Sequence, residues 1–513
     1  MADVTTCALW NAQVLCDGAS LRTLGLISIF HHGVRRCGQR KLLRQRSYPS
    51  RYPQHQHSSD ASRCAISSSS GFITDSFPGV DPLRPYVAYE AMHDSGEVDA
   101  QGNCHPGTRI AIQGIIKRWA DDPHPNAFVS LMIAAAGAGK SAIMRTIAKV
   151  LEEEGKLLGG FFCFRSSKRR NDGNLVIATL AAQLVTRIPH LRPRVYKAYE
   201  DNQGMFTKAM DIQALKLVIE PLNSIDPVER PQWPHVVLLD GLDEINGLAV
   251  QQAIVKVLAY INDHLVSPLH FLVASRPEPP ILHAFDEFLG GRWSQLELDD
   301  SLKPNDDIDM FYIDHFQKIC DRNPHLPLGW PGVPVRRILV DKGSGKFIFA
   351  SVVVGVVGDS SSTLSPQERL DLVLEVTRRD DLRPLERLDL LYVTVLHQIP
   401  EVTRPQVLHI LSLILAAGNT LDGLRPTLSF LDALFCVPSG TTRHRLCHLH
   451  SILNIPANGN TVSPQHATLG DFVFDKARSE RFGFHVDKTQ LAEGTFRRIA
   501  EALQSNAEQM SGQ

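Results

Sequence analysis

The stretch LMIAAAGAGKSAI, residues 131–143, constrains the fold of this chain more than any other segment. Three apolar residues precede a loop of small residues, and the loop ends in Gly-Lys-Ser ahead of apolar residues at helical spacing. In the pattern G-x-x-x-x-G-K-[ST], backbone N–H groups surround a phosphate, the lysine reaches the terminal phosphates and the hydroxyl holds Mg²⁺. The sequence therefore predicts nucleotide binding by Gly137, Ala138, Gly139, Lys140, Ser141 and Ala142.

One position departs from this pattern, because Ala134 stands where the first glycine is normally found. An alanine forced to positive φ would cost roughly 1–2 kcal/mol. That cost would weaken the site, or a small change of loop geometry would absorb it, without removing Lys140 or Ser141. The alternative is a small-residue turn with a chance Gly-Lys-Ser.

Strand-like and helix-like segments alternate from about residue 105, which indicates an α/β fold with a parallel sheet covered by helices. After residue 300 the apolar spacing is mainly helical. The uncharged run at 347–358 is too short to span a membrane and predicts a buried helix. Near the end, LHSILNIP and FGFHV are strand-like and flank a helical segment, as in a winged-helix unit. The predicted parallel strands are 127–134, 159–166, 235–241, 269–275 and 294–300.

The first 72 residues carry nine Lys/Arg against three Asp and are rich in serine. This composition is typical of a disordered tail, and a mitochondrial transit peptide or a basic nucleic-acid arm are the alternatives. The whole chain has a net charge of −2, so we expect no nucleic-acid partner. The predicted order is a tail at 1–92, an α/β domain at 104–300, a helical domain at 301–420, a winged-helix-like module at 421–490 and a short tail at 491–513.

The nine cysteines form no C-x-x-C pair, which argues against a zinc ribbon and a disulfide framework. We therefore expect a cytoplasmic protein with reduced thiols. Cys447, His448, His450 and His466 are near one another in the sequence, but the first three are too crowded for ordinary zinc-finger spacing.

Acidic residues follow a second buried strand candidate, in HVVLLDGLDEI at residues 235–245. Four apolar residues end at Asp240, which places its carboxylate where it can hold Mg²⁺. Asp243 and Glu244 follow, and either could orient or deprotonate an attacking water. A third strand candidate ends in VASRPEP, so Arg276 would project at the carboxyl edge of the sheet and sense a γ-phosphate. The alternative for the acidic residues is a solvated turn, and the alternative for Arg276 is a surface cation at the end of a strand.

Six segments together resemble a known family. They are CHPGTR (104–109), GAGKSAI, FFCFRSSKRRN, HVVLLDGLDE, LHFLVASRPEP and GSGKFIFAS. In this order they resemble the fungal NACHT proteins of the STAND class of P-loop NTPases, including nephrocystin-like N-terminal NACHT modules, from about residue 93 to about residue 490. The resemblance implies slow hydrolysis of ATP, a winged-helix module that closes over bound ADP, and a homo-oligomer in the ATP state. Signalling in non-self recognition or programmed cell death is the implied output.

The resemblance also implies individual roles. Lys140 and Ser141 match the phosphate and Mg²⁺ ligands, and Asp240 matches the metal aspartate. Asp243 matches the catalytic acid and Arg276 the sensor. QHATLGDFVFD is similar to the histidine motif of the winged-helix module, which implies that His466 contacts the β-phosphate of ADP; an ordinary helix-start residue is the alternative.

Two departures from the family bear on function. Ala134-Ala135 replaces the usual Gly-Pro, and no repeat domain follows residue 490. We expect a minimal member, a truncated gene product or a partner of longer relatives, with protein effectors as further partners. The competing functions are a metabolic P-loop kinase, for which we find no acceptor-site motif, and a non-hydrolysing NACHT-fold scaffold. The intact Lys140, Ser141, Asp240 and Asp243 oppose the scaffold.

Overall fold

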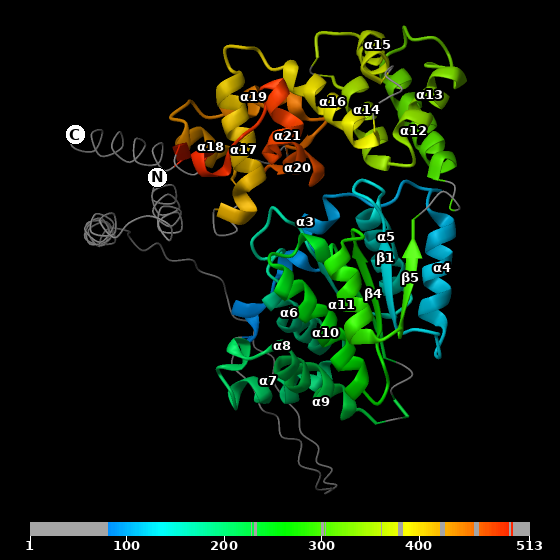
Figure 1. Cartoon of the computed structure of the whole chain (residues 1–513), viewed down its shortest axis with the longest axis vertical. Coiled ribbons are helices and arrows are strands. Elements are labelled where there is room, and N and C mark those ends of the chain that lie inside the picture. Colours follow the sequence, from blue (N-terminus) through cyan, green and yellow to red (C-terminus); the bar gives the residue numbers. More distant parts are fainter. Residues whose placement is uncertain are drawn as a thin grey trace, which may run out of the picture. The chain divides into compact units, whose positions relative to one another are not determined.

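The computed structural model describes residues 81–226, 228–229, 233–298, 302, 304–360, 362–377, 383–420, 426–455, 461–491 and 494–495 (Figure 1). The first part of this range is an α/β domain built on a five-stranded parallel sheet in the order β2-β3-β4-β1-β5. The strands are β1 Val129–Ile133, β2 Leu157–Phe162, β3 Val236–Asp240, β4 His270–Ser275 and β5 Trp293–Glu297. All five predicted strands are present, with β2 beginning two residues earlier than expected.

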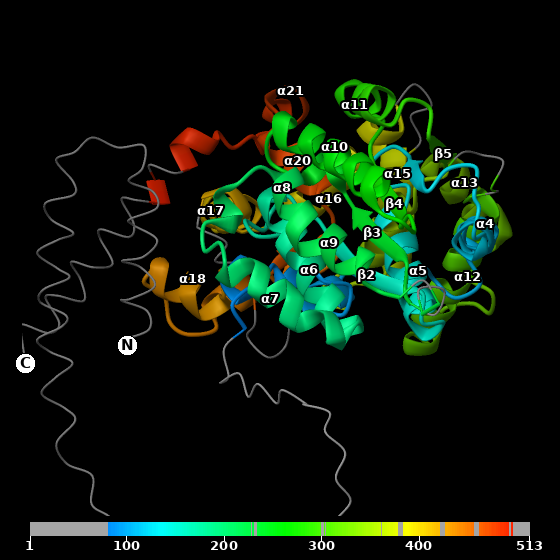
Figure 2. The ribbon, with the colours of Figure 1, turned by 90° about the horizontal axis from the view of Figure 1, so that it is seen from below.

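Side chains alternate between the two faces of the strands, so each face has its own core. On one face, Met132, Leu238 and Leu272 pack against helices α4 Ile110–Asp121 and α5 Lys140–Glu153. On the other face, Leu131, Leu239 and Val273 pack against α6 Val176–Arg187, α10 Leu248–His264 and α11 Pro279–Leu289. Figure 2 shows this arrangement of helices around the sheet from a second direction. Shorter helices complete the domain: α3 Gly96–Asp99, α7 Arg192–Glu200, α8 Met210–Ala214, the π-helical turn Leu215–Ile219 and α9 Glu220–Asn223.

After β5 the described chain is mainly helical. One apolar cluster extends from Ile308 to Leu491 and holds this region together. Its longer helices are α12 Pro304–Arg322, α13 Val333–Gly343, α14 Phe347–Val357, α15 Pro366–Thr377, α16 Pro384–His397 and α17 Arg404–Thr420. Shorter elements follow: α18 Leu428–Leu434, α19 Thr441–Arg445, the antiparallel pair β6 Leu453–Asn454 and β7 Ser463–Pro464, α20 Thr468–Phe474 and α21 Lys476–Ser479. The described chain is thus an α/β domain with a parallel sheet followed by a helical region.

The apolar run at 347–358 forms α14, which is a core helix as predicted: Phe349, Val353 and Val357 are buried. In the part of the chain that the structure describes, no helix has both the length and the apolar character to cross a membrane.

The strand predicted for FGFHV is absent, which corrects the sequence analysis. Gly483 has a φ of +75° and ends a short 3₁₀ helix. The N–H groups of Phe484 and Val486 then donate to the carbonyls of Ser479 and Val473, at the ends of α21 and α20. These backbone groups therefore bond to helix ends instead of to a neighbouring strand, and Phe484 is buried in the helical core.

Part of the segment assigned to the N-terminal tail is folded. Two 3₁₀ turns, Arg84–Tyr86 and Tyr89–Ala91, bury Leu83, Val87 and Ala91 in the core that covers one face of the sheet. Arg169 also donates to the carbonyl of Val87. The tail was predicted from the polar, serine-rich stretch that precedes these residues. The residues themselves are apolar, and their burial explains why this segment is folded. Residues 1–80 and most of the predicted C-terminal tail lie outside the described residues.

Candidate functional site

The loop between β1 and α5 has the backbone that a phosphate cradle requires. Gly137 and Gly139 have φ values of +80° and +96°, which glycine adopts without the strain that a Cβ would bring. Gly139 directly precedes Lys140, the first residue of α5, so the N-terminus of a long helix faces the loop. The Lys140 ammonium donates to the loop itself, at 2.7 Å from the carbonyl oxygen of Ala134.

The backbone of Ala134 decides between the two alternatives for this position, because it carries no left-handed strain. Among the described residues other than glycine, positive φ occurs only at Arg109, Ser344 and Cys436. Ala134 directly follows β1 and is buried, and its carbonyl is an acceptor for Lys140. The loop therefore reaches its turn at Gly137, and an alanine at position 134 needs no unusual backbone conformation.

The structure brings every predicted site residue to one cavity of about 250 Å³. The carboxyl ends of β1, β3 and β4 meet at this cavity because the strands are parallel. Residues from the helical region line it as well, including Phe347 and Ile348 at the start of α14. The predicted residues that line it are Gly137, Ala138, Gly139, Lys140, Ser141, Ala142, Asp240, Asp243, Glu244, Arg276 and His466.

Asp240 and Ser141 offer oxygen atoms that suit Mg²⁺. Asp240 is 3% exposed at the end of β3, and its Oδ1 is buried with no hydrogen-bond partner among the described residues. Burial raises the pKa of Asp240, while Arg145 and a hydrogen bond from Ser141 favour its ionised form. A buried carboxylate oxygen without a partner next to a hydroxyl fits a hard divalent cation. When bound, the cation would neutralise charge on the phosphates.

Asp243 is bonded to Arg276, so its carboxylate is less available to act on a water molecule than that of an unpaired catalytic acid. Its Oδ1 accepts a hydrogen bond from the backbone N–H of Arg276 at 3.0 Å, and its Oδ2 is 3.1 Å from Arg276 Nε. Burial disfavours the charge of Arg276, but Asp471 and Asp243 outweigh this effect and raise its pKa. Asp243 therefore holds the arginine in place, and its predicted action on water remains a prediction.

Glu244 lies beside Asp243 and is the better placed of the two to exchange a proton. Burial and the neighbouring Asp243 raise the pKa of Glu244 to about 7. Its Oε2 accepts a hydrogen bond from the backbone N–H of Arg165 at 2.9 Å, which fixes the carboxyl group. A general base works best when its pKa is near the working pH.

His466 is held as a neutral imidazole with a defined tautomer. The N–H of Thr468 donates to Nδ1 at 3.1 Å, so Nδ1 is an acceptor and the ring proton is on Nε2. The Thr468 hydroxyl lies 2.9 Å from the same nitrogen and 2.8 Å from the hydroxyl of Tyr392. Burial, aided by Arg276, lowers the pKa of His466 to about 4. The residue can therefore offer an Nε2–H donor to an anion at neutral pH.

Several residues of the site were not predicted from the sequence. Arg109 is 5% exposed, donates to the carbonyl of Ala138 in the loop at 2.8 Å and lies over the ring of Phe347. It is the last residue of the CHPGTR segment, which was its only signal. Arg165 and Asp471 form a 2.8 Å ion pair next to Arg276, although 306 residues separate them. Nothing in the sequence pairs residues so far apart.

In the described part of the chain, Cys447, His448, His450 and His466 are not among the side chains close enough to share one metal ion. Within the described ranges, the group close enough to share a metal ion is His105, Asp314 and His315. Asp314 already accepts from His105 Nε2 at 3.0 Å and pairs with the ammonium of Lys318 at 2.6 Å. A lysine on this carboxylate disfavours a cation, so we interpret the group as an ion-pair network.

Comparison with known proteins agrees with this geometry. No curated protein matches the chain. Residues 110–276 match the sequence model of the family described as nephrocystin 3, N-terminal. The match begins at the first residue of α4 and ends at Arg276, so it includes the phosphate loop, Asp240, Asp243 and Glu244. Over these residues the chain is similar to the nephrocystin 3 N-terminal family, which supports a nucleotide-binding NTPase of the NACHT type.

Proposed function

We propose that this chain is a nucleotide-controlled switch of the STAND class, which binds ATP and ADP with Mg²⁺, hydrolyses ATP slowly and self-assembles in the cytoplasm in its ATP state. One observation carries the proposal: the cavity is shared by the NTPase domain and the helical region. Ile348 and His466 line it together with Lys140 and Arg276. A ligand in this cavity therefore contacts both parts of the chain and can change how they pack.

The helical region contacts the phosphate loop of the NTPase domain directly. The N–H of Ile348 donates to the carbonyl of Gly137 at 3.2 Å, so the start of α14 is bonded directly to the phosphate loop. A second bond comes from α20, where Asp471 accepts a hydrogen bond from Arg276 at 3.1 Å. An enzyme that only transfers a phosphate to a small acceptor has no need for such bonds to a second region, whereas a switch requires them.

In this proposal each predicted residue has a defined task. Lys140 and the loop amides hold the phosphates, and Ser141 with Asp240 holds Mg²⁺. Glu244 or Asp243 orients or deprotonates the attacking water. Arg276 contacts the γ-phosphate, and His466 donates to the β-phosphate of ADP.

The first test is to denature the purified protein and identify any released nucleotide by chromatography. Lys140→Ala should abolish ADP and ATP binding, because it removes the side-chain cation at the phosphates. Lys149→Ala is the matched control: this lysine is exposed on the same helix and pairs with Asp99. Unchanged nucleotide affinity in Lys140→Ala, measured by calorimetry, would contradict the site.

A second test addresses assembly. Light scattering after size-exclusion chromatography should show a larger particle with a non-hydrolysable ATP analogue than with ADP. A nucleotide-binding protein that keeps one size in both states would contradict the switch and leave the NTPase assignment standing.

A further inference from the structure

Arg276 shares its guanidinium with two carboxylates, Asp243 of the NTPase domain and Asp471 of the helical region. Its Nε lies 3.1 Å from Asp243 Oδ2, and its Nη2 donates to Asp471 Oδ2 at 3.1 Å. The other oxygen of Asp471 accepts from Arg165 Nη1 at 2.8 Å. Asp471 therefore bridges two arginines at the edge of the cavity.

We propose that Asp471 makes the site selective for a nucleoside diphosphate over a triphosphate, because it occupies the guanidinium of Arg276 that a γ-phosphate needs. The inference rests on the proposed function, since it assumes that this cavity takes a nucleotide. A diphosphate makes no demand on Arg276 and leaves the pair with Asp471 intact. A triphosphate brings further negative charge to the same arginine and must displace the carboxylate.

The environment makes this competition strong. The side chains of Asp471 and Arg276 are 18% and 23% exposed, and that of Asp243 is 3% exposed. Charges in such partly buried positions interact more strongly than charges on the surface, because solvent screens them less. A γ-phosphate and the Asp471 carboxylate therefore cannot share Arg276 without substantial repulsion.

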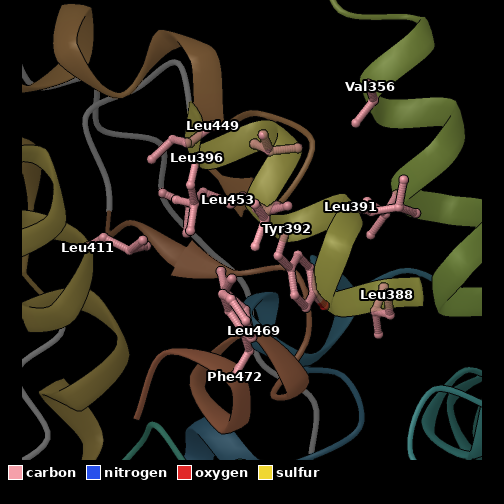
Figure 3. Close-up of a cluster of buried hydrophobic side chains, with 14 of the residues drawn as sticks. Val356, Leu388, Leu391, Tyr392, Leu396, Leu411, Leu449, Leu453, Leu469 and Phe472 are labelled. Carbon is pink, nitrogen blue, oxygen red and sulfur yellow. The ribbon is translucent and has the colours of Figure 1, made fainter. Parts of the chain in front are cut away.

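Asp471 cannot simply swing away, because α20 is anchored in the helical core. Leu469 and Phe472 of this helix are buried among residues of α16 and α17, as Figure 3 shows. The rings of Phe472 and Tyr392 lie 5.9 Å apart, and the Tyr392 hydroxyl bonds to Thr468. To release Arg276, α20 has to move together with the elements on which it packs. Selectivity for the diphosphate is thereby linked to the packing of the helical region.

The test is to measure the affinities for ADP and for a non-hydrolysable ATP analogue, with Mg²⁺, in wild type and in Asp471→Asn. The substitution keeps the shape of the side chain and removes its charge. Asp475→Asn is the matched control, because Asp475 is exposed four residues away and caps α21, a position where asparagine serves equally well. The ratio of the ATP-analogue Kd to the ADP Kd should fall about tenfold in Asp471→Asn, the usual scale of coupling between sites, and stay unchanged in Asp475→Asn.

Two further variants keep the test decisive if Asp471→Asn is poorly folded. Asp471→Ser removes the same charge with a smaller side chain and should shift the ratio in the same direction. Asp471→Glu keeps the charge and should retain the preference for ADP. Nucleotide binding with an unchanged ratio in both charge-removing variants would overturn the inference and leave the proposed function standing. Failure of wild type to bind either nucleotide would overturn both.

Discussion

Gly137 is the point at which the phosphate loop leaves no room for a side chain, so Gly137→Ala tests the geometry of the site most directly. A Cβ at this position would lie 2.0 Å from Ile348 Cγ2 and 3.0 Å from Ile348 Cβ. The glycine also has a φ of +80°. At Gly139 the φ is +96°, but a Cβ there would meet nothing within 4 Å. The two glycines therefore separate backbone strain from a steric clash.

The expected magnitudes follow from this difference. Left-handed backbone costs an alanine about 1–2 kcal/mol, which is the whole effect at Gly139. At Gly137 an overpacking cost of about 1–3 kcal/mol is added, because Ile348 is buried at the start of α14 and has little room to move. We therefore expect Gly137→Ala to lower the free energy of unfolding by about 2–5 kcal/mol and Gly139→Ala by about 1–2 kcal/mol.

The assay is denaturant unfolding of both variants, combined with a double-mutant cycle that includes Ile348→Ala. That substitution removes the atom that would lie at 2.0 Å, so it should recover most of the overpacking cost of Gly137→Ala. ADP affinity measured by calorimetry should fall more in Gly137→Ala than in Gly139→Ala, because the clash displaces the loop from α14. Equal destabilisation by the two glycine substitutions, or no coupling to Ile348, would refute the reasoning.

Ala134→Gly should not tighten ADP or ATP binding, because Ala134 has no positive φ to relieve. The substitution should lower the free energy of unfolding by up to about 1 kcal/mol. Tighter nucleotide binding in calorimetry would show strain at this position. Burial lowers the pKa of His466 and of His270 to about 4. Between pH 4 and about 6.5 the unfolded state therefore binds more protons than the folded state. The free energy of unfolding should fall as the pH drops through this range, by about 1.4 kcal/mol per pH unit for each histidine. The pKa of Glu244 is raised to about 7, so its own contribution is lost as the pH rises from 4.5 through 7, and Glu244→Gln should steepen the dependence between pH 4.5 and 6.5. Denaturant unfolding across this range provides the measurement, and a profile that Glu244→Gln leaves unchanged would contradict the assignment.

The parts of the fold that could be predicted are those that depend on residues consecutive in the sequence. Each strand of the sheet is a short run of apolar residues, and such runs are recognisable because both faces of a covered parallel sheet are buried. The polar residues that follow β3 and β4 then meet at one edge because the strands are parallel, so the sequence alone predicts that Asp240 and Arg276 lie near the loop.

The rest depends on contacts between distant residues or on backbone angles. FGFHV has the composition of a strand, but its backbone bonds to the ends of two helices, which composition does not reveal. The φ of Ala134 depends on where the loop turns, and the motif pattern does not fix that position. Asp471 lies in QHATLGDFVFD, a segment singled out for His466 alone, and only the packing of α20 brings the aspartate to Arg276.

Two of the contacts between the helical region and the candidate nucleotide site arise from one packed unit. Ile348 touches Gly137 at the loop, and Asp471 binds Arg276 beside the cavity. Both contacts originate in the same apolar cluster, because Ile348 of α14 and Leu469 of α20 are members of it. Closely packed cores change between discrete arrangements and do not deform gradually. A ligand that displaces Asp471 therefore acts on the same packed unit that holds Ile348 against the loop, and we expect loss of one contact to weaken the other.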